Sequence, residues 1–287
     1  MSGALRSLLV FLALSGCDDG PPASVDSGFR LTEDAFAFTN FTGDGRLEMN
    51  GDLAARMFGA DAVCIDGALP CTPTGAALGW IETVNEHLAE GRSEGMAILA
   101  LLLRRGDLDA EEFGGSSASE LRLDGNPELQ AELAYWAATQ YVAGVVNHRR
   151  FDATDVIPFL AEALAPDATE RYRLAIAVRE DDGSYAHGHA LVPIGYYADE
   201  SRGGVYWLRV YDGNVPNREL LLEIDSKNGT WRYEVPAGEG TLVYEGTPAN
   251  DNPLTFAPVS ERLGVLPAPF AEDSPHLTEV LTRVFEI

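Results

Sequence analysis

The hydrophobic periodicity changes type partway along this chain, and that change constrains the fold more than any other feature. Four stretches in the first part have apolar side chains at helical spacing, namely residues 74–90, 93–104, 126–141 and 154–164. From residue 172 onward, runs of β-branched and aromatic residues alternate with turn residues, which predicts strands at residues 172–179, 187–197, 205–211, 219–225 and 230–235. Helices followed by strands predict an α+β fold, in which an N-terminal helical half packs on a C-terminal antiparallel sheet.

The length and charge of the chain limit its organisation and its partners. We expect one domain over residues 35–235, which begins with a short strand at residues 35–39 and is followed by a proline-rich extension, residues 236–287, that wraps around it. Against 45 Asp and Glu stand only 20 Lys and Arg, for a formal net charge of −25. Because no basic stripe is dense enough to neutralise a phosphate backbone, we expect no nucleic-acid partner.

The N-terminal residues indicate export. Residues 1–16 combine one positive charge with a short apolar run, which is typical of a signal peptide. The sequence Leu14-Ser15-Gly16-Cys17 is similar to a bacterial lipobox at all four positions, and lipid on Cys17 would hold the protein on a bacterial membrane at the cell envelope. The alternative is a plain secretory signal with a chance cysteine. Residues 17–34, with several Pro, Ser and Gly, are predicted to form a flexible tether.

The chain has three cysteines, Cys17, Cys64 and Cys71. With Cys17 acylated, the other two are close in sequence in an exported protein, and a disulfide between them is the natural interpretation. A metal pair and two free thiols are the alternatives. The disulfide leaves no thiol for catalysis.

Two segments contain the candidate catalytic residues. The first, Gly91-Arg92-Ser93-Glu94-Gly95-Met96, opens the apolar helix, where the N-terminal end of the helix dipole stabilises negative charge. The second comprises Gly188-His189-Ala190 on one predicted strand and Tyr211-Asp212-Gly213-Asn214 at the end of the next. An Asp at the end of a neighbouring strand is suited to orient the ring of His189.

These motifs, over residues 71–233, resemble the papain-like cysteine peptidase superfamily, and more closely its branch of bacterial double-glycine leader peptidases. In that family a Gly-x-Cys-x-Gly-Met turn begins the central helix, a Gly-His-Ala strand brings the base, and a Tyr-Asp-x-Asn turn brings the orienting residue. The resemblance implies a papain-like fold in which His189 is the base, Asp212 is the third member, and Ser93 stands where the family has its nucleophilic cysteine.

The serine at this position determines the functional prediction. Papain-type chemistry depends on a thiol that ionises before substrate binds, whereas a serine hydroxyl is far too weak an acid to do so. The family pattern also supplies part of the oxyanion hole from a Gln six residues before the nucleophile, and that position is His87 here. Asn85 is a nearby amide and a second oxyanion candidate.

Three hypotheses follow. The first is a lipid-anchored, catalytically degenerate peptidase homologue that binds a peptide or protein segment in its cleft, with no cofactor. The second is an active serine hydrolase or acyltransferase that uses Ser93, His189 and Asp212. The third and weakest is a metal-binding lipoprotein, in which His187 and His189, two apart on a strand, share a metal with Asp212.

Overall fold

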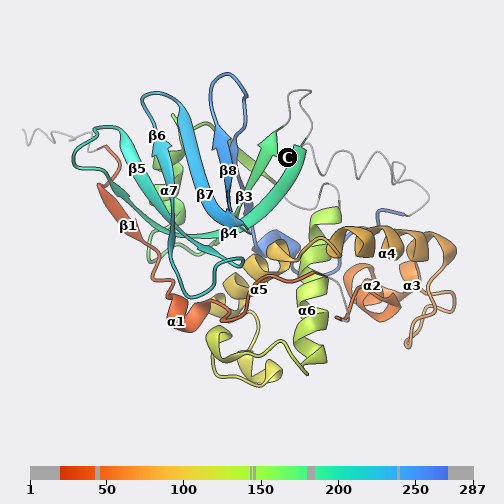
Figure 1. Ribbon diagram of the computed structural model, residues 1–287. Helices are drawn as coiled ribbons and strands as arrows, with labels where there is room; N and C mark the ends of the chain where they lie inside the picture. The colour runs from red at the N-terminus through yellow and green to blue at the C-terminus, as the bar shows by residue number, and fades with distance from the viewer. Residues whose placement is uncertain are drawn as a thin grey trace, which may run out of the picture.

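The chain forms a helical half and a curled antiparallel sheet that pack against each other (Figure 1). The computed structural model describes residues 20–42, 46–142, 144, 147–179, 185–237 and 240–270. The α-helices there are α1 (Leu31–Asp34), α2 (Gly51–Phe58), α3 (Ala60–Val63), α4 (Gly75–Leu88), α5 (Ser93–Arg105), α6 (Pro127–Ala138) and α7 (Val156–Ala163). The strands are β1 (Ser24–Asp26), β2 (Arg149–Phe151), β3 (Tyr172–Arg179), β4 (Tyr185–Ala198), β5 (Val205–Asp212), β6 (Leu220–Asp225), β7 (Thr230–Ala237), β8 (Gly240–Gly246) and β9 (Leu254–Pro258).

The predicted helices and the strands predicted from residue 172 onward are present, with ends that shift by a few residues. The side chain of Thr74 caps α4 by accepting a hydrogen bond from Ala77 N, and Asn126 caps α6 in the same way with Pro127 in the first turn. Residues 35–39 are not a strand, contrary to expectation. Their alternation arises because Phe36 is buried in the helical core while the chain crosses towards the sheet.

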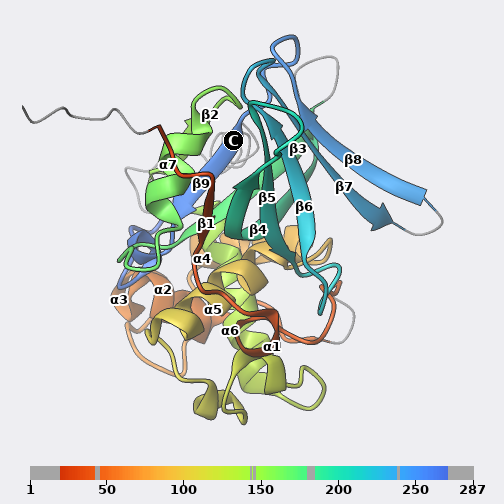
Figure 2. The ribbon, with the colours of Figure 1, turned by 90° about the vertical axis from the view of Figure 1, so that its left-hand side faces the viewer.

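All strands in the described part of the chain belong to one antiparallel sheet in the order β2-β9-β3-β4-β5-β6-β7-β8. The long strand β4 pairs with β3 over its first half and with β1 over its second half. Helices α5 and α6 pack on one face of the sheet and α7 covers the other (Figure 2). Side chains alternate along β4, so that Ala190 and Val192 join the core of the helical half while Leu191 joins the core beneath α7.

Two boundaries differ from the sequence-based expectation. Residues 24–34, expected to be tether, form β1 and α1, and Phe29 there is only 2% exposed. The expected C-terminal wrap contributes β8 and β9, and β9 lies inside the sheet between β2 and β3. Short strands at the ends of a chain carry too little periodicity to be distinguished from extended loops. The predicted signal peptide and Cys17 lie outside the described residues.

The close approach of α5 and α6 explains one glycine of the motif at the start of α5. A Cβ at Gly95 would lie 2.2 Å from the carbonyl oxygen of Leu133 on α6, far inside contact distance. Only glycine therefore allows the first turn of α5 to pack this closely against its neighbour.

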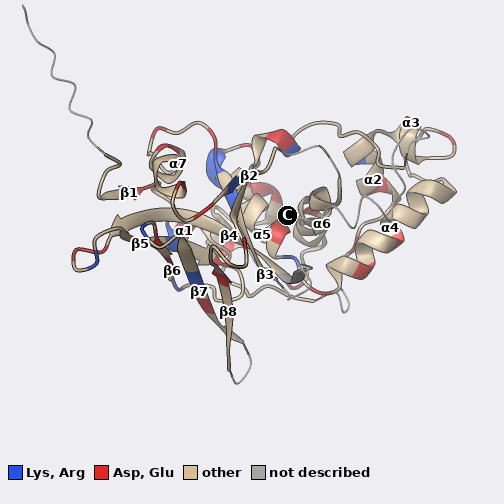
Figure 3. Cartoon of the chain, turned by 90° about the horizontal axis from the view of Figure 1, so that it is seen from above, with Lys and Arg blue, Asp and Glu red and all other residues tan. Residues whose placement is uncertain are grey.

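The predicted disulfide between Cys64 and Cys71 is present and closes the loop between α3 and α4. Across the part of the chain that the structure describes, no helix is both long and apolar enough to cross a membrane. Acidic residues lie on several elements, including α4 (Figure 3).

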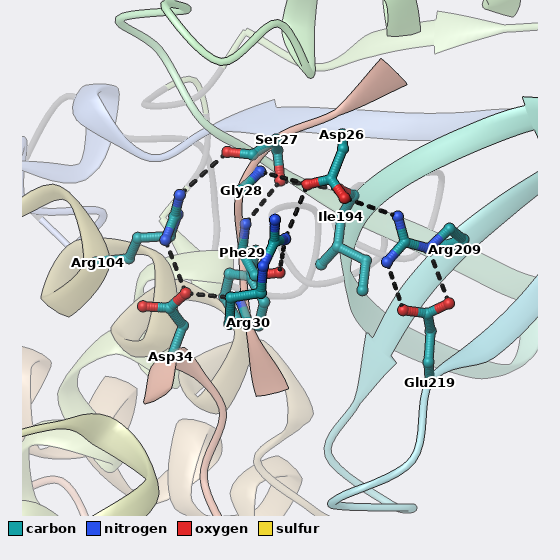
Figure 4. A network of polar contacts seen from close by, with 10 residues as sticks. All are labelled: Asp26, Ser27, Gly28, Phe29, Arg30, Asp34, Arg104, Ile194, Arg209 and Glu219. Carbon is teal, nitrogen blue, oxygen red and sulfur yellow. Dashed lines mark hydrogen bonds and ion pairs between the residues drawn. The ribbon is translucent and has the colours of Figure 1, made fainter. Parts of the chain in front are cut away.

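A polar network ties the N-terminal segment to both halves (Figure 4). The Arg209 guanidinium on β5 donates to both carboxylate oxygens of Glu219, at 2.8 Å each, and to Asp26 Oδ2 at 3.0 Å. Arg104 on α5 donates to Asp34 at 2.7 Å and to the carbonyl of Ser27 at 3.0 Å. Partial burial raises the pKa of Asp26, but hydrogen bonds from Arg30, Gly28 and Arg209 outweigh it and hold this pKa at about 2.

We expect Arg209→Ala to lower the free energy of unfolding by about 1 kcal/mol, because it leaves the carboxylates of Asp26 and Glu219 without their shared cation. The folded-state pKa of Asp26 is depressed, so its stabilising contribution is present at neutral pH and is lost as pH falls towards 2. The decrease in the free energy of unfolding caused by Arg209→Ala should therefore be smaller in acid than at neutral pH. Urea denaturation at pH 7 and pH 3 measures both effects. The matched control is Arg232→Ala, which removes an arginine from exposed pairs on β7; an equal loss in both variants would contradict a special role for the network.

Candidate functional site

A cleft of about 510 Å³ opens between the start of α5 and the sheet. Its lining includes Ser93, His189 and Asn214, the last of these in the turn that follows Asp212. Its other lining residues include Gln140 and Tyr141, which follow α6, Arg173 on β3, Leu242 and Tyr244 on β8, and Pro253 just before β9. The volume is within the range of sites that take small molecules or short peptide segments.

His189 and Asp212 form a buried hydrogen-bonded pair. His189 Nε2 lies 2.8 Å from Asp212 Oδ1, and the two side chains are 4% and 0% exposed. They face each other because Leu191 pairs with Asp212 across β4 and β5, and His189 lies two residues before Leu191 on the same face. Since an ionised carboxylate only accepts hydrogen bonds, Nε2 carries the hydrogen and Nδ1 is the basic nitrogen of the neutral ring.

Asp212 is held by two further donors. Tyr233 OH donates to its Oδ2 at 2.5 Å, and Asn214 N donates to its Oδ1 at 2.7 Å. Burial raises the pKa of Asp212, but the hydrogen bond and charge of His189 and the hydrogen bonds of Tyr233 and Asn214 outweigh it, so that the net pKa lies below its usual value. The carboxylate is therefore ionised and fixed in orientation at neutral pH. The role of Tyr233 had no signal in the sequence, because it depends on strand register.

Ser93 begins α5 and lies half-buried in the cleft. Its Oγ accepts a hydrogen bond of 3.3 Å from the backbone N–H of Ala190, the residue after His189. Ser93 and His189, both described by the structure, therefore lie close together but share no hydrogen bond between Oγ and the imidazole. The serine does not cap α5, since the N-cap position is Arg92 and no side chain fills that role.

Asn40 links the start of α5 to the turn after Asp212, and the sequence did not reveal this role. Its Oδ1 accepts from Arg92 N at 2.8 Å, its Nδ2 donates to Asn214 Oδ1 at 3.0 Å, and its backbone N donates to Gly213 O at 2.7 Å. One residue of the N-terminal segment therefore sets the spacing between the start of α5 and the turn that carries Asp212.

The two oxyanion candidates are placed differently. Asn85 does not line the cleft, because its amide exchanges two hydrogen bonds of 2.9 Å with the backbone of Met49. His87 does line the cleft, and its ring stacks on Tyr141 with centroids 5.3 Å apart. A side chain amide donor from this part of α4 is therefore not directed at Ser93.

The structure describes no group of three or more His, Cys, Asp and Glu residues arranged to hold a metal ion, a statement that covers only the residues with described side chains. His189 Nε2 is engaged by Asp212. The side chain of His187, the other ligand of the metal hypothesis, lies outside the described part.

We expect Tyr233→Phe to lower the free energy of unfolding by about 2 kcal/mol at pH 7, because a buried carboxylate loses a hydrogen bond. The pKa of Asp212 should rise towards its usual value. A depressed folded-state pKa stabilises the protein above the unfolded-state pKa, and this stabilisation is lost as pH falls through the folded-state pKa. The difference in the free energy of unfolding between the variant and wild type, measured by urea denaturation, should therefore be smaller at pH 3 than at pH 7.

The control is Tyr196→Phe, which removes a hydroxyl that donates to the neutral carbonyl of Pro22 at 2.9 Å. Its effect should be smaller and constant over the same pH range. A Tyr233→Phe effect that does not change with pH would contradict the hydrogen bond from Tyr233 as a cause of the low pKa of Asp212.

No family model, curated protein or solved structure matches this chain. The function is therefore inferred from the geometry of the cleft and the chemistry of the residues that line it.

Proposed function

We propose that this protein is a papain-like domain that has lost peptidase activity and binds a peptide or protein segment in its cleft. The observation that carries the proposal is the cleft itself, where a serine at the start of a buried helix lies beside an intact His189–Asp212 pair. We further propose that lipid on Cys17 holds the domain at a bacterial membrane, with the resemblance of residues 14–17 to a lipobox as the support.

The arrangement of the three residues supports a papain-like origin. A helix from the first half brings Ser93, and two strands from the second half bring His189 and Asp212. Asp212 holds the ring through Nε2, which leaves Nδ1 as the nitrogen available to act as a base.

Two features argue against cleavage. The serine hydroxyl ionises far less readily than a thiol and needs a base in hydrogen-bond contact, yet Ser93 Oγ makes no hydrogen bond to the described imidazole of His189 and accepts only from the backbone N–H of Ala190. The amide that would best stabilise an oxyanion, Asn85, is engaged with Met49. A cleft that retains its lining residues, but has neither a serine bonded to its base nor a free Asn85 amide for an oxyanion, is suited to binding a ligand without cleaving it.

The test of the papain-like arrangement is Ser93→Cys followed by titration with iodoacetamide. We expect the new thiol to react at least about tenfold faster at pH 7 than the thiol of Ser201→Cys on an exposed loop, because the helix start and His189 lower the pKa of the thiol. Mass spectrometry locates the modified residue. The double variant Ser93→Cys with His189→Ala should fall to the rate of the control. A Ser93→Cys rate equal to the control would show that the base does not act at this position.

The alternative function, a serine hydrolase or acyltransferase, is favoured by the intact base and orienting carboxylate. A fluorophosphonate probe distinguishes the two functions, since it labels a serine only when a base activates it. We expect no labelling of Ser93 in the wild-type protein. Labelling of Ser93 that disappears in His189→Ala would overturn the binding-only function and establish the hydrolase.

A further inference from the structure

The wall of the cleft beside Ser93 holds a buried charge cluster made of Glu94, Arg173 and Arg262. Their side chains are 6%, 1% and 0% exposed. Glu94 accepts from Arg173 Nε at 2.9 Å and from Arg262 Nη2 at 2.5 Å. Glu94 lies in the first turn of α5, where it is the shared partner of the two arginines.

The charge cluster carries one excess positive charge. Burial raises the pKa of Glu94, but the two arginines outweigh it, so that the carboxyl is ionised. Burial lowers the pKa of Arg262 to about 10, which leaves it protonated at neutral pH. Burial raises the pKa of the nearby Tyr141, so this residue is neutral at pH 7. Desolvation and the two arginines lower the pKa of His148 to about 4, so this residue is also neutral at pH 7. Two cations therefore face one anion.

Two donors of the charge cluster have no hydrogen-bond acceptor, and one of them belongs to a residue that lines the cleft. Arg173 Nη1 is buried and has no hydrogen-bond partner, and Arg173 is the arginine of the cluster that lines the cleft. A buried guanidinium donor without a partner is costly, and the cost falls when an anionic group reaches it. Arg262 Nε also lacks a partner, but Arg262 does not line the cleft.

The distance of Arg173 from Ser93 follows from strand register. Arg173 and Ala175 lie two residues apart on one face of β3, and Ala175 pairs with Ala190, whose N–H contacts Ser93. Two residues along a strand span about 6–7 Å. A ligand chain that passes Ser93 therefore reaches Arg173 within about two residues.

We propose that Arg173 binds a carboxylate of the peptide ligand, an inference that rests on the proposed peptide-binding function. A singly charged carboxylate matches the single excess charge of the cluster. A phosphate monoester carries more charge than this and would lie against Glu94 and Glu90, so it fits the site less well. The carboxylate belongs either to the C-terminus of the ligand or to an Asp or Glu side chain.

Retention of random hexapeptide pools by the purified full-length protein tests the proposal, with ultrafiltration and mass spectrometry as the readout. The first pool has free C-termini and no Asp or Glu, the second has amidated C-termini with Asp and Glu, and the third has amidated C-termini without them. We expect the third pool to be retained at least about tenfold less than the better of the other two, because it lacks the charge-assisted hydrogen bond. The better pool identifies the source of the carboxylate.

Matched variants assign the effect to Arg173. Glu94→Gln combined with Arg173→Gln removes both charges of one pair at similar volume, and should abolish the difference between the pools. Arg173→Lys keeps the charge and should keep part of the difference, provided circular dichroism shows that both variants are folded. Arg232→Gln, on the exposed face of β7, should behave as wild type.

The outcomes separate the two proposals. Equal retention of all three pools, or a difference that survives in the folded double variant, would overturn carboxylate binding by Arg173 and leave peptide binding intact. Retention of no pool by the wild-type protein would overturn the peptide-binding function, and the inference with it.

Discussion

The ion pairs of Glu94 fix the start of α5 against the sheet, and the position of Ser93 depends on them. Glu94 bonds Arg173 on β3, near the middle of the sheet, and Arg262 on the short 3-10 helix η4 (Ser260–Arg262). Buried charges are stable only with correctly placed partners, so few other positions of this helix would satisfy all three. Within this constraint Ser93 meets the backbone of Ala190.

Successive side chains of β4 point to opposite faces of the sheet, so His189 and Ala190 take different parts in the site. His189 lies on the face of Asp212, whereas Ala190 lies on the face of the helical half. The base of the site is therefore a side chain of β4, whereas the contact with Ser93 is made by the backbone N–H of the next residue. Both His189 and Ser93 line the cleft.

Hydrophobic periodicity predicted the helices and strands that have regular apolar spacing. It did not predict the side-chain contacts between segments that are distant in sequence. The strand at Tyr172–Arg179 and the helix that begins at Ser93 were predicted because their apolar spacing is regular. The pairing of His189 with Asp212 was also anticipated, since neighbouring strands bring such residues together. Asn40, Tyr233 and Arg173 were missed as site residues, because each reaches the site from a segment distant in sequence. Short β1 and β9 were missed because three to five residues carry no measurable period.

The insertion of β9 between β2 and β3 has a consequence for how the molecule acquires its structure. The strand ends at Pro258, and the same region supplies Asn252, Pro253 and Thr255 to the wall of the cleft. Both neighbours of β9 precede it by more than seventy residues, so β2 cannot join the rest of the sheet until residues 254–258 have been synthesised. A nascent chain that stops short of this strand therefore lacks both the link between β2 and β3 and part of the cleft lining.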